Sequence, residues 1–196
     1  SFHYGKKAYM VYFVTPDHEA LWGAVIPVPE ESLSEIKSLS YREWRGKILD
    51  EYEKDADYFS KFIQNNDDIN RIPLYDLESL PSWHKGNVCL VGDSAHAMTP
   101  HAGQGASMAL ESSIILAKCI RDIPNTQKAF AKFQELRKPR VEHMIQQARK
   151  QGKFSTMTNP VMKWFRARIL PLMIKLGSSQ IDEIYNYKTN WDKKIE

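Results

Sequence analysis

The stretch NVCLVGDSAHAMTPHAGQGA, residues 87–106, is the part of the sequence that decides the fold. Residues 87–91 form a short apolar run between Gly86 and Gly92, the pattern of a strand buried on both faces, as in a parallel sheet. A loop over residues 92–101 follows, and a helix is expected over residues 103–121. A buried strand that leads through a loop into a helix predicts part of an α/β fold.

Upstream of this stretch, the sequence predicts a β-hairpin and two helices. Residues 6–15 and 19–28 are rich in strand-forming side chains, and residues 16–18 supply a turn. Ser40 and Glu43 have the spacing of a capping box for a helix over residues 41–52, and a shorter helix is expected over residues 55–64. The hairpin aromatics alternate between two faces, and the pattern does not decide whether one face packs in the core or lines a substrate pocket. They are Tyr9, Tyr12, Phe13 and Trp22.

Downstream, the sequence predicts helices only. The helix over residues 103–121 has apolar residues at helical spacing, namely Ala106, Ala109, Leu110, Ile114 and Ala117. A second helix is expected over residues 126–150, kinked or interrupted at Pro139, with one apolar side made of Phe130, Phe133, Leu136, Val141, Met144 and Ile145. Residues 154–177 are expected to form two short helices broken by Pro160 and Pro171. The lone strand at residues 87–91 therefore needs neighbours that these 196 residues do not supply.

Composition excludes several classes of protein. With 42% hydrophobic and 26% charged residues, the chain is neither disordered nor a disulfide scaffold, and no apolar run is long enough to span a membrane. Cys89 and Cys119 lie in apolar stretches and are expected to be buried thiols of a reducing, cytoplasmic compartment, with one disulfide left open. The start at Ser1 lacks the pattern of a signal peptide, and we expect the sequence to be part of a longer chain.

The net charge of +3 hides an asymmetry along the chain. Residues 1–100 carry 10 Lys and Arg against 16 Asp and Glu, whereas residues 101–196 carry 17 against 8. Residues 151–180 contain five basic side chains and no acid. Such a face is either a solvated or intramolecular surface, or one that meets a phosphate group or makes weak contact with a membrane surface. A nucleic-acid partner is not expected.

Residues 92–106 combine features that are typical of a site for a flat ligand. Asp93 follows the predicted strand, at the edge where α/β folds bind ligands, and its carboxylate suits a sugar or polyol hydroxyl. Gly103 and Gly105 open the helix and allow a ligand to approach the backbone closely. The amides at a helix N-terminus carry partial positive charge, which favours an electron-rich group in front of them.

The stretch resembles the second flavin-binding motif of the class A FAD-dependent aromatic hydroxylases, the para-hydroxybenzoate hydroxylase-like flavoprotein monooxygenases. The family pattern is Gly-Asp-Ala-Ala-His, three residues, Pro, two residues, Gly-x-Gly, x, Asn, x, Ala, x, Glu-Asp-Ala. The matching positions are Gly92, Asp93, Ala95, His96, Pro100, Gly103, Gly105, Ala109 and Glu111. The resemblance is sharp over residues 71–119 and weaker elsewhere.

This resemblance implies FAD as cofactor and NAD(P)H as reductant, with molecular oxygen forming a flavin hydroperoxide that hydroxylates an aromatic or similarly electron-rich small molecule. Asp93 would hydrogen-bond the ribityl chain, Pro100 would lie beside the flavin ring, and the amides of residues 103–106 would face the pyrimidine edge of the ring. The implied cofactor-binding residues are Gly92, Asp93, Pro100, Gly103, Gln104, Gly105, Ala106 and Ser107. The implied catalytic residues are Pro100 and His96, and no metal is implied.

The departures from the pattern define what the chain is expected to be. Ser107 replaces the usual Asn, and Ser112 and Ser113 replace Asp-Ala. The family's N-terminal Gly-x-Gly-x-x-Gly and its central Asp-Gly motif do not occur in the 196 residues, so the chain resembles the C-terminal half of such an enzyme. The implied fold is α/β, or α+β as a fragment. It combines part of a Rossmann-like FAD-binding domain with an antiparallel substrate-domain sheet and C-terminal helices.

The implied domain boundaries follow from this division. Residues 1–75 would be a remnant of the substrate-binding domain, residues 76–123 the C-terminal part of the FAD-binding domain, and residues 124–196 a helical region. The alternative is a cofactor-free fragment that acts as an interaction module of a split flavoprotein. A hydrolase with Ser94 as nucleophile lacks the required elbow sequence. The spacing of His84, His96 and His101 fits no standard metal site.

Overall fold

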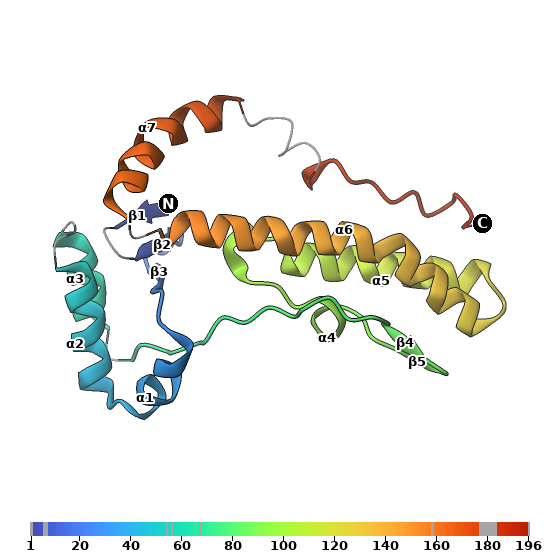
Figure 1. The fold of residues 1–196 in the computed structure, drawn as a ribbon, viewed down its shortest axis with the longest axis horizontal. Coiled ribbons are helices and arrows are strands. Elements are labelled where there is room, and N and C mark those ends of the chain that lie inside the picture. Colours follow the sequence, from blue (N-terminus) through green and yellow to red (C-terminus); the bar gives the residue numbers. More distant parts are fainter. Residues whose placement is uncertain are drawn as a thin grey trace. The chain divides into compact units, whose positions relative to one another are not determined.

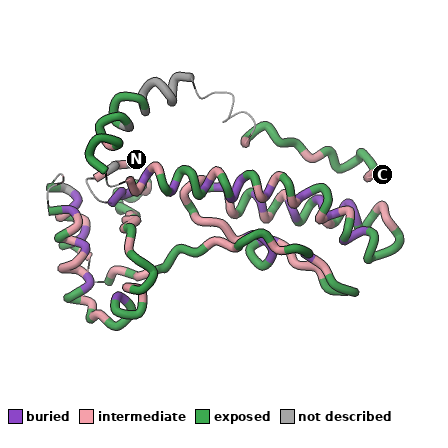
Figure 2. Tube along the Cα trace, in the orientation of Figure 1, coloured by how far each residue is buried: buried purple, intermediate pink, exposed green. Residues whose placement is uncertain are grey.

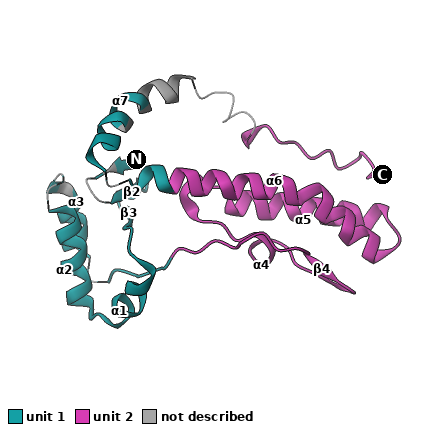
Figure 3. Ribbon diagram, viewed as in Figure 1, with its two compact units in different colours: residues 1–73, 153–169 teal, residues 74–152, 170–196 magenta. Residues whose placement is uncertain are grey.

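The computed structural model describes residues 2–5, 8–53, 55, 57–66, 68–157, 159–176 and 184–195 (Figure 1). The chain divides into two compact units, residues 1–73 with 153–169 and residues 74–152 with 170–196 (Figure 3). In the described residues, each unit combines helices with one small antiparallel sheet. The fold is therefore of the mixed, α+β type, as expected for a fragment.

The sheet of the first unit contains the predicted hairpin. Its strands are β1 (Phe2–Tyr4), β2 (Tyr9–Val14) and β3 (Ala20–Val25), in the order β1-β2-β3 and all antiparallel. Tyr12 pairs with Trp22, and Phe13 pairs with Leu21. The hairpin is thus confirmed, whereas β1 was not predicted. Residues 6 and 7, the predicted start of the first strand, lie outside the described residues.

The register separates the hairpin aromatics into two groups. The ring of Tyr12 lies 5.3 Å from that of Phe62, and Trp22 packs against the buried cluster of this unit. Phe13 remains 61% exposed beside Leu21, which is 64% exposed. Tyr12 and Trp22 therefore belong to the core of the unit, and an exposed apolar edge is left at Phe13 and Leu21.

Four helical elements of the first unit come directly after this sheet in the chain, and the three longer ones share a buried cluster with it. They are η1 (Glu30–Ser32), α1 (Leu33–Ser38), α2 (Tyr41–Tyr52) and α3 (Asp57–Gln64). The predicted capping box is confirmed: the Ser40 side chain accepts from the Glu43 amide, and the Ser40 amide donates to the Glu43 carboxylate at 2.7 Å. These bonds lower the pKa of Glu43 because they stabilise its ionised form. The core of the unit includes Met10, Ile48, Tyr52 and Ile63.

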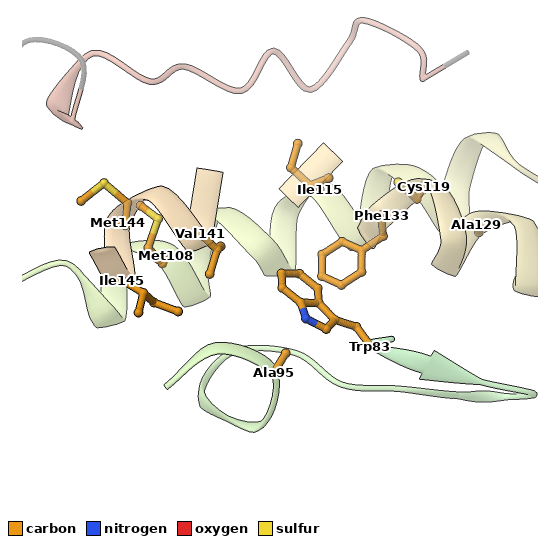
Figure 4. Packing of buried hydrophobic residues seen from close by; sticks show 10 residues of the cluster. All are labelled: Trp83, Ala95, Met108, Ile115, Cys119, Ala129, Phe133, Val141, Met144 and Ile145. Atoms are coloured by element: carbon orange, nitrogen blue, oxygen red, sulfur yellow. The ribbon is translucent and has the colours of Figure 1, made fainter. Parts of the chain in front are cut away.

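Two long helices lie side by side in the second unit, α5 (Gly105–Asp122) and α6 (Thr126–Ser155), whose last three residues are assigned to the first unit (Figures 1 and 3). A chain segment with β4 (His84–Lys85), β5 (Val88–Cys89), α4 (Asp93–His96) and η2 (Pro100–Ala102) packs against them. The indole of Trp83 points from this segment toward Phe133, with ring centres 5.7 Å apart (Figure 4). Burial of these rings fixes the loop segment on the helix pair.

The strand predicted over residues 87–91 is shorter and more exposed than expected. Only Val88 and Cys89 form a strand, which pairs antiparallel with β4 after a turn at Gly86, where φ is 57°. Val88 is 66% exposed and Cys89 is half-buried. The predicted strand is therefore wrong in its length and in its burial on both faces. The described residues offer β5 no parallel neighbour, as the sequence had indicated.

The buried face of α5 differs from the apolar face that the sequence suggested. Met108, Ser112, Ile115 and Cys119 face α6 and are buried. The predicted stripe is largely open instead: Ala109 is half-buried, and the exposed residues are Ala106, Leu110, Ile114 and Ala117. The helix also begins at Gly105 rather than at residue 103, because Gly103 adopts a left-handed conformation. Both cysteines are free, and only Cys119 is buried as expected.

Prolines interrupt the C-terminal helices less than predicted. Pro139 lies inside α6 without ending it, although Leu136 on the predicted apolar side is 40% exposed. Residues 160–176 form one helix, α7 (Pro160–Leu176), where two short helices were expected. Pro160 occupies its first position, where no amide hydrogen is needed, and the Asn159 side chain caps the next two amides.

Most of the described part of α7 is exposed (Figure 2). Val161, Met162, Trp164, Phe165 and Ile169 are 43–60% exposed, and the guanidinium of Arg168 lies 5.3 Å from the Trp164 ring. No helix in the described ranges is long and apolar enough to cross a bilayer. The expected weak contact with a membrane surface stays a prediction.

Candidate functional site

The structure has an open pocket at the start of α5. Its volume is about 440 Å³, within the size range of small-molecule sites, which is roughly 300–1,000 Å³. The lining residues are Asp93, Met98, Pro100, Gly103, Gly105, Ala106 and Ala109. Five of the eight predicted cofactor-binding residues thus meet around one cavity: Asp93, Pro100, Gly103, Gly105 and Ala106.

A tight turn presents Asp93 to this pocket. Gly92 has φ 61° and ψ −140°, a backbone conformation that residues other than glycine rarely adopt. Its carbonyl accepts the amides of Ala95 and His96 at 2.9 and 3.0 Å, which closes the single turn of α4. The Ser94 hydroxyl accepts from the Val91 amide and donates to the Val91 carbonyl, so it is committed to the backbone. Asp93 itself is exposed.

The floor of the pocket is backbone. Gly103 has φ 62° and ψ 22°, and its amide donates to the Pro100 carbonyl at 2.9 Å. A Cβ atom added at Gly103 would meet nothing within 4 Å, and one at Gly105 would meet only the Met98 side chain, at 3.7 Å. Packing within the chain would therefore tolerate a Cβ atom at both positions. The bare backbone instead leaves room for a flat group from outside.

The first turn of α5 supplies the polarity of the site. No side chain caps this helix end, and its first turn contains no acid. The Met108 amide is the first to donate within the helix, to the Gln104 carbonyl. The amides of Gly105, Ala106 and Ser107 therefore precede the helical ladder and create partial positive charge beside the pocket. An electron-rich edge of a ring, or a developing negative charge, is favoured there.

Four of the predicted site residues do not line the pocket. Gly92 lies behind it, where an added Cβ would be 3.5 Å from the Ala109 methyl group. Gln104 is buried, whereas Ser107 is exposed on α5. His96 is 2% exposed and points into the interior, where Nε2 lies 3.1 Å from the Ser112 hydroxyl.

The environment of His96 favours the neutral imidazole. Burial is the main cause that lowers its pKa, and the nearby guanidinium of Arg137 lowers it further. The indole of Trp83 lies 5.4 Å from the imidazole ring. Within the described part of the chain, no three His, Cys, Asp or Glu residues are placed to hold a metal ion.

Sequence reasoning missed a buried ionic cluster behind the pocket. Arg137 of α6 is fully buried, and its Nη1 lies 2.8 Å from Glu111 Oε2. Arg140 pairs with the same carboxylate through Nε and Nη2 at 2.8 and 2.9 Å, and Tyr187 stacks on Arg140 at 4.1 Å. The available signal was weak: Glu111 is the only acid between residues 94 and 121, and two arginines are three positions apart on α6.

The match to a family model falls on the segment that forms the pocket. The family model described as a FAD binding domain matches residues 75–148. Over 100 residues the chain is 39% identical to the 2-heptyl-3-hydroxy-4(1H)-quinolone synthase of Pseudomonas aeruginosa, covering 50% of this chain and 26% of that protein. It is 36% identical over 93 residues to the salicylate hydroxylase of Pseudomonas putida, covering 45% of this chain and 21% of that enzyme.

Solved structures share the fold over almost the whole chain. Klebsiella pneumoniae HpxO, in complex with FAD and uric acid, superposes with a TM-score of 0.80 over 93% of this chain, at 21% identity. A salicylate hydroxylase–substrate complex superposes with a TM-score of 0.69 over 95% of this chain, at 20% identity. The chain spans 47% and 46% of those two structures.

These matches confirm the resemblance that the motif predicted. The chain is similar to the class A FAD-dependent aromatic hydroxylases, and residues 75–148 are the part that the FAD binding domain model matches. The relatives named above include a salicylate hydroxylase and a structure in complex with FAD and uric acid. The chain spans only part of each of them.

Proposed function

We propose that this chain forms the flavin-ring side of a FAD- and NAD(P)H-dependent monooxygenase that hydroxylates an aromatic or similarly electron-rich small molecule. One observation supports this most strongly. The pocket lined by Asp93, Pro100 and the start of α5 coincides with the residues of the flavin-binding motif, inside the segment matched by the FAD-binding family model. The cofactor-free interaction module is the competing proposal, and it gives the pocket no role.

The residues of the pocket fit a flavin ring. The open backbone at Gly103 and Gly105 leaves space that a Cβ atom would enter, which suits the face or edge of a planar group. The uncapped amides at the start of α5 suit an edge rich in carbonyl oxygens. Asp93 is an exposed acceptor at the mouth of the pocket and suits a polyol chain. Shape, polarity and hydrogen-bonding capacity therefore agree with the same cofactor.

When bound, FAD would supply the redox chemistry, with NAD(P)H as the reductant and molecular oxygen as the source of the transferred oxygen atom. Asp93 would accept a hydrogen bond from a ribityl hydroxyl, and the amides of residues 105–107 would stabilise negative charge on the ring edge. Pro100 and Met98 form an apolar wall that keeps water from the reacting side. Gly92 shapes the turn behind Asp93, and Gln104 positions the first turn of α5. His96 supports the site from the buried side of the pocket.

We further propose that another segment, in the same or a separate chain, binds the ADP half of FAD. The 196 residues contain no Gly-x-Gly-x-x-Gly; Gly103 and Gly105 belong to a sequence that ends in Met108 instead. A pocket for the ring alone would bind FAD weakly, because the pyrophosphate would remain in solvent. The substrate would reach the other side of the ring.

A flavin titration tests the proposal. The chain, joined to or mixed with the ADP-binding segment, is titrated with FAD while flavin fluorescence is recorded. Asp93→Ala is expected to weaken FAD binding about 10-fold, the effect of one lost hydrogen bond to a charged acceptor of about 1.4 kcal/mol. Asp17→Ala, at an exposed acid in the hairpin turn, is the matched control and should leave affinity unchanged. Equal affinities for both variants would contradict the role of Asp93.

A steric variant tests the pocket independently of charge. Ala106→Phe places a ring in the pocket and is expected to lower FAD affinity more than 10-fold without loss of stability, because Ala106 is exposed. Ala131→Phe, an exposed site on α6, is the matched control. The assembled protein should also oxidise NAD(P)H faster when an aromatic substrate is present. An assembled protein that binds no flavin would support the interaction module instead.

A further inference from the structure

The ionic cluster behind the pocket contains a cation whose placement is not explained by stability alone. Arg137 is fully buried, and its guanidinium contacts three groups on α5: Glu111 at 2.8 Å, the Ser112 hydroxyl at 3.3 Å and the Met108 carbonyl at 3.4 Å. Burying an ion pair gains little over well-packed apolar side chains, because both charges lose their hydration. The orientation that the guanidinium imposes on its neighbours is therefore the feature to explain.

Ser112 connects this cation to the segment that carries Asp93. Its oxygen must accept from Arg137, because a guanidinium only donates hydrogen bonds. The same oxygen lies 3.1 Å from Nε2 of His96, and the two groups share a hydrogen bond. Because Ser112 is bonded to Arg137 on one side and to the imidazole on the other, the contacts hold the ring in one orientation.

His96 is in turn part of the turn that carries Asp93. Its amide and that of Ala95 both donate to the Gly92 carbonyl, and α4 contains only the four residues from Asp93 to His96. Trp83 lies 5.4 Å from the imidazole ring and limits its movement on another side. A change in ring position therefore has to move the turn, and with it the carboxylate at the pocket mouth.

We propose that Arg137 is a positioning residue for the pocket, which acts through Ser112 and His96 to hold the α4 turn that presents Asp93. The structural part of this proposal is independent of the cofactor. Its effect on flavin binding rests on the function proposed above. The charged and titratable groups that face His96 are Arg137 from α6 and Asp93 from its own helix, with the neutral Ser112 and Trp83 completing its surroundings.

The first test follows the His96 ring by NMR in the full chain, without FAD. In the unaltered protein, the imidazole of His96 should titrate below the range of an ordinary histidine, because burial lowers its pKa. Ser112→Asp places a carboxylate against the ring and should move its titration upward by about one unit or more. Arg149→Lys, at an exposed pair with Asp76, is the control and should change nothing. An ordinary titration of His96 in the unaltered chain would overturn the proposal.

The second test measures coupling to the pocket in the assembled flavoprotein. Ser112→Ala should weaken FAD binding about 5-fold, yet less than 2-fold when Asp93 is already Ala, because both changes act through the same carboxylate. A general loss of packing would give the same factor in both backgrounds, and that result would overturn the proposal. Arg137→Lys keeps the charge but not the planar fork, and it should reproduce the effect of Ser112→Ala.

The two tests separate the two proposals. If the assembled protein does not bind FAD at all, the proposed function fails, and the NMR titration still decides whether Arg137 and Ser112 hold His96. If FAD binds and the coupling is absent, only the positioning role fails. The Ser112 variants keep the test open if Arg137→Lys does not fold, since Ser112→Ala removes one hydroxyl and no charge.

Discussion

The first turn of α5 and the face of the same helix that packs on α6 are built in opposite ways. Toward the pocket, Gly105 and Ala106 expose backbone amides and almost no side chain. Toward α6, Ser112 and Arg137 are completely buried and make specific polar contacts. The space for a flat ligand therefore comes from the absence of side chains at the start of α5. The position of this backbone depends on the tightly packed residues behind it.

The largest expected effect breaks the packed side. Phe133 is completely buried between Trp83 and the helices. Phe133→Ala should lower the free energy of unfolding by about 3–5 kcal/mol, because a buried aromatic ring is replaced by a cavity. Denaturant titration followed by circular dichroism measures this loss. Leu136→Ala on the same helix, at a side chain that is 40% exposed, should cost about 1 kcal/mol, and equal losses would contradict the assigned core.

The turn at Gly92 links the two sides, and its substitution should have the next largest effect. Gly92→Ala forces a side chain into φ 61° and ψ −140°, which costs about 1–3 kcal/mol of strain. Gly46→Ala is the matched control: Gly46 lies inside α2 with nothing within 4 Å of an added Cβ, so stability should rise by up to about 1 kcal/mol. Thermal unfolding of both variants measures the difference. An unchanged unfolding midpoint for Gly92→Ala would contradict the strain assigned to this turn.

Low pH should lower the stability of the part of the chain packed behind the pocket, because histidines are at least partly buried there. Burial lowers the folded-state pKa of both His96 and His101, so the unfolded chain binds more protons below its own histidine pKa of about 6.5. Their contribution to stability is therefore complete above pH 6.5 and is lost as pH falls from there toward the folded-state pKa values. Unfolding midpoints at pH 7 and pH 5 measure this loss. A His96→Gln variant should lose less stability between these two pH values, and an unchanged difference would contradict the assignment to His96.

The smallest expected change in stability concerns the contact between the C-terminal segment and the outer surface of α5. Trp191 of the C-terminal segment stacks on Arg121 of α5 at 4.5 Å and is half-exposed. Trp191→Ala should cost about 0.5–1 kcal/mol, the usual strength of an exposed cation–π contact. Tyr185→Ala, at a side chain that is 70% exposed, should cost less than about 0.5 kcal/mol. A similar loss for the two variants in thermal unfolding would show that the stacking contributes nothing specific.

The sequence predicted local features better than packing partners. Ser40 and Glu43 gave the first residue of α2 because a capping box depends only on neighbours in the chain. The buried face of α5 was predicted wrongly since the helix has apolar residues on two sides, and periodicity alone cannot tell which side meets α6. The strand at residues 87–91 is shorter and more exposed than its apolar residues suggested, while the lack of a parallel neighbour in the described residues agrees with the sequence.

The site shows the same division. Asp93, Pro100, Gly103, Gly105 and Ala106 were predicted from one continuous motif, and all of them line the pocket. Arg137 could not be predicted, because its role depends on a contact between α6 and α5 over 25 residues of sequence separation. His96 belongs to the motif, yet only the folded structure places its ring away from the pocket lining.

The central claim to test is that a flavin ring binds against the start of α5. With 15N-glycine labelling, the chain gives signals from only nine glycines, so each amide can be followed while FAD is added to the assembled protein. If a flavin ring binds there, the amide signals of Gly103 and Gly105 should shift strongly and that of Gly92 should shift less. Tight FAD binding that leaves Gly103 and Gly105 unmoved would contradict this claim.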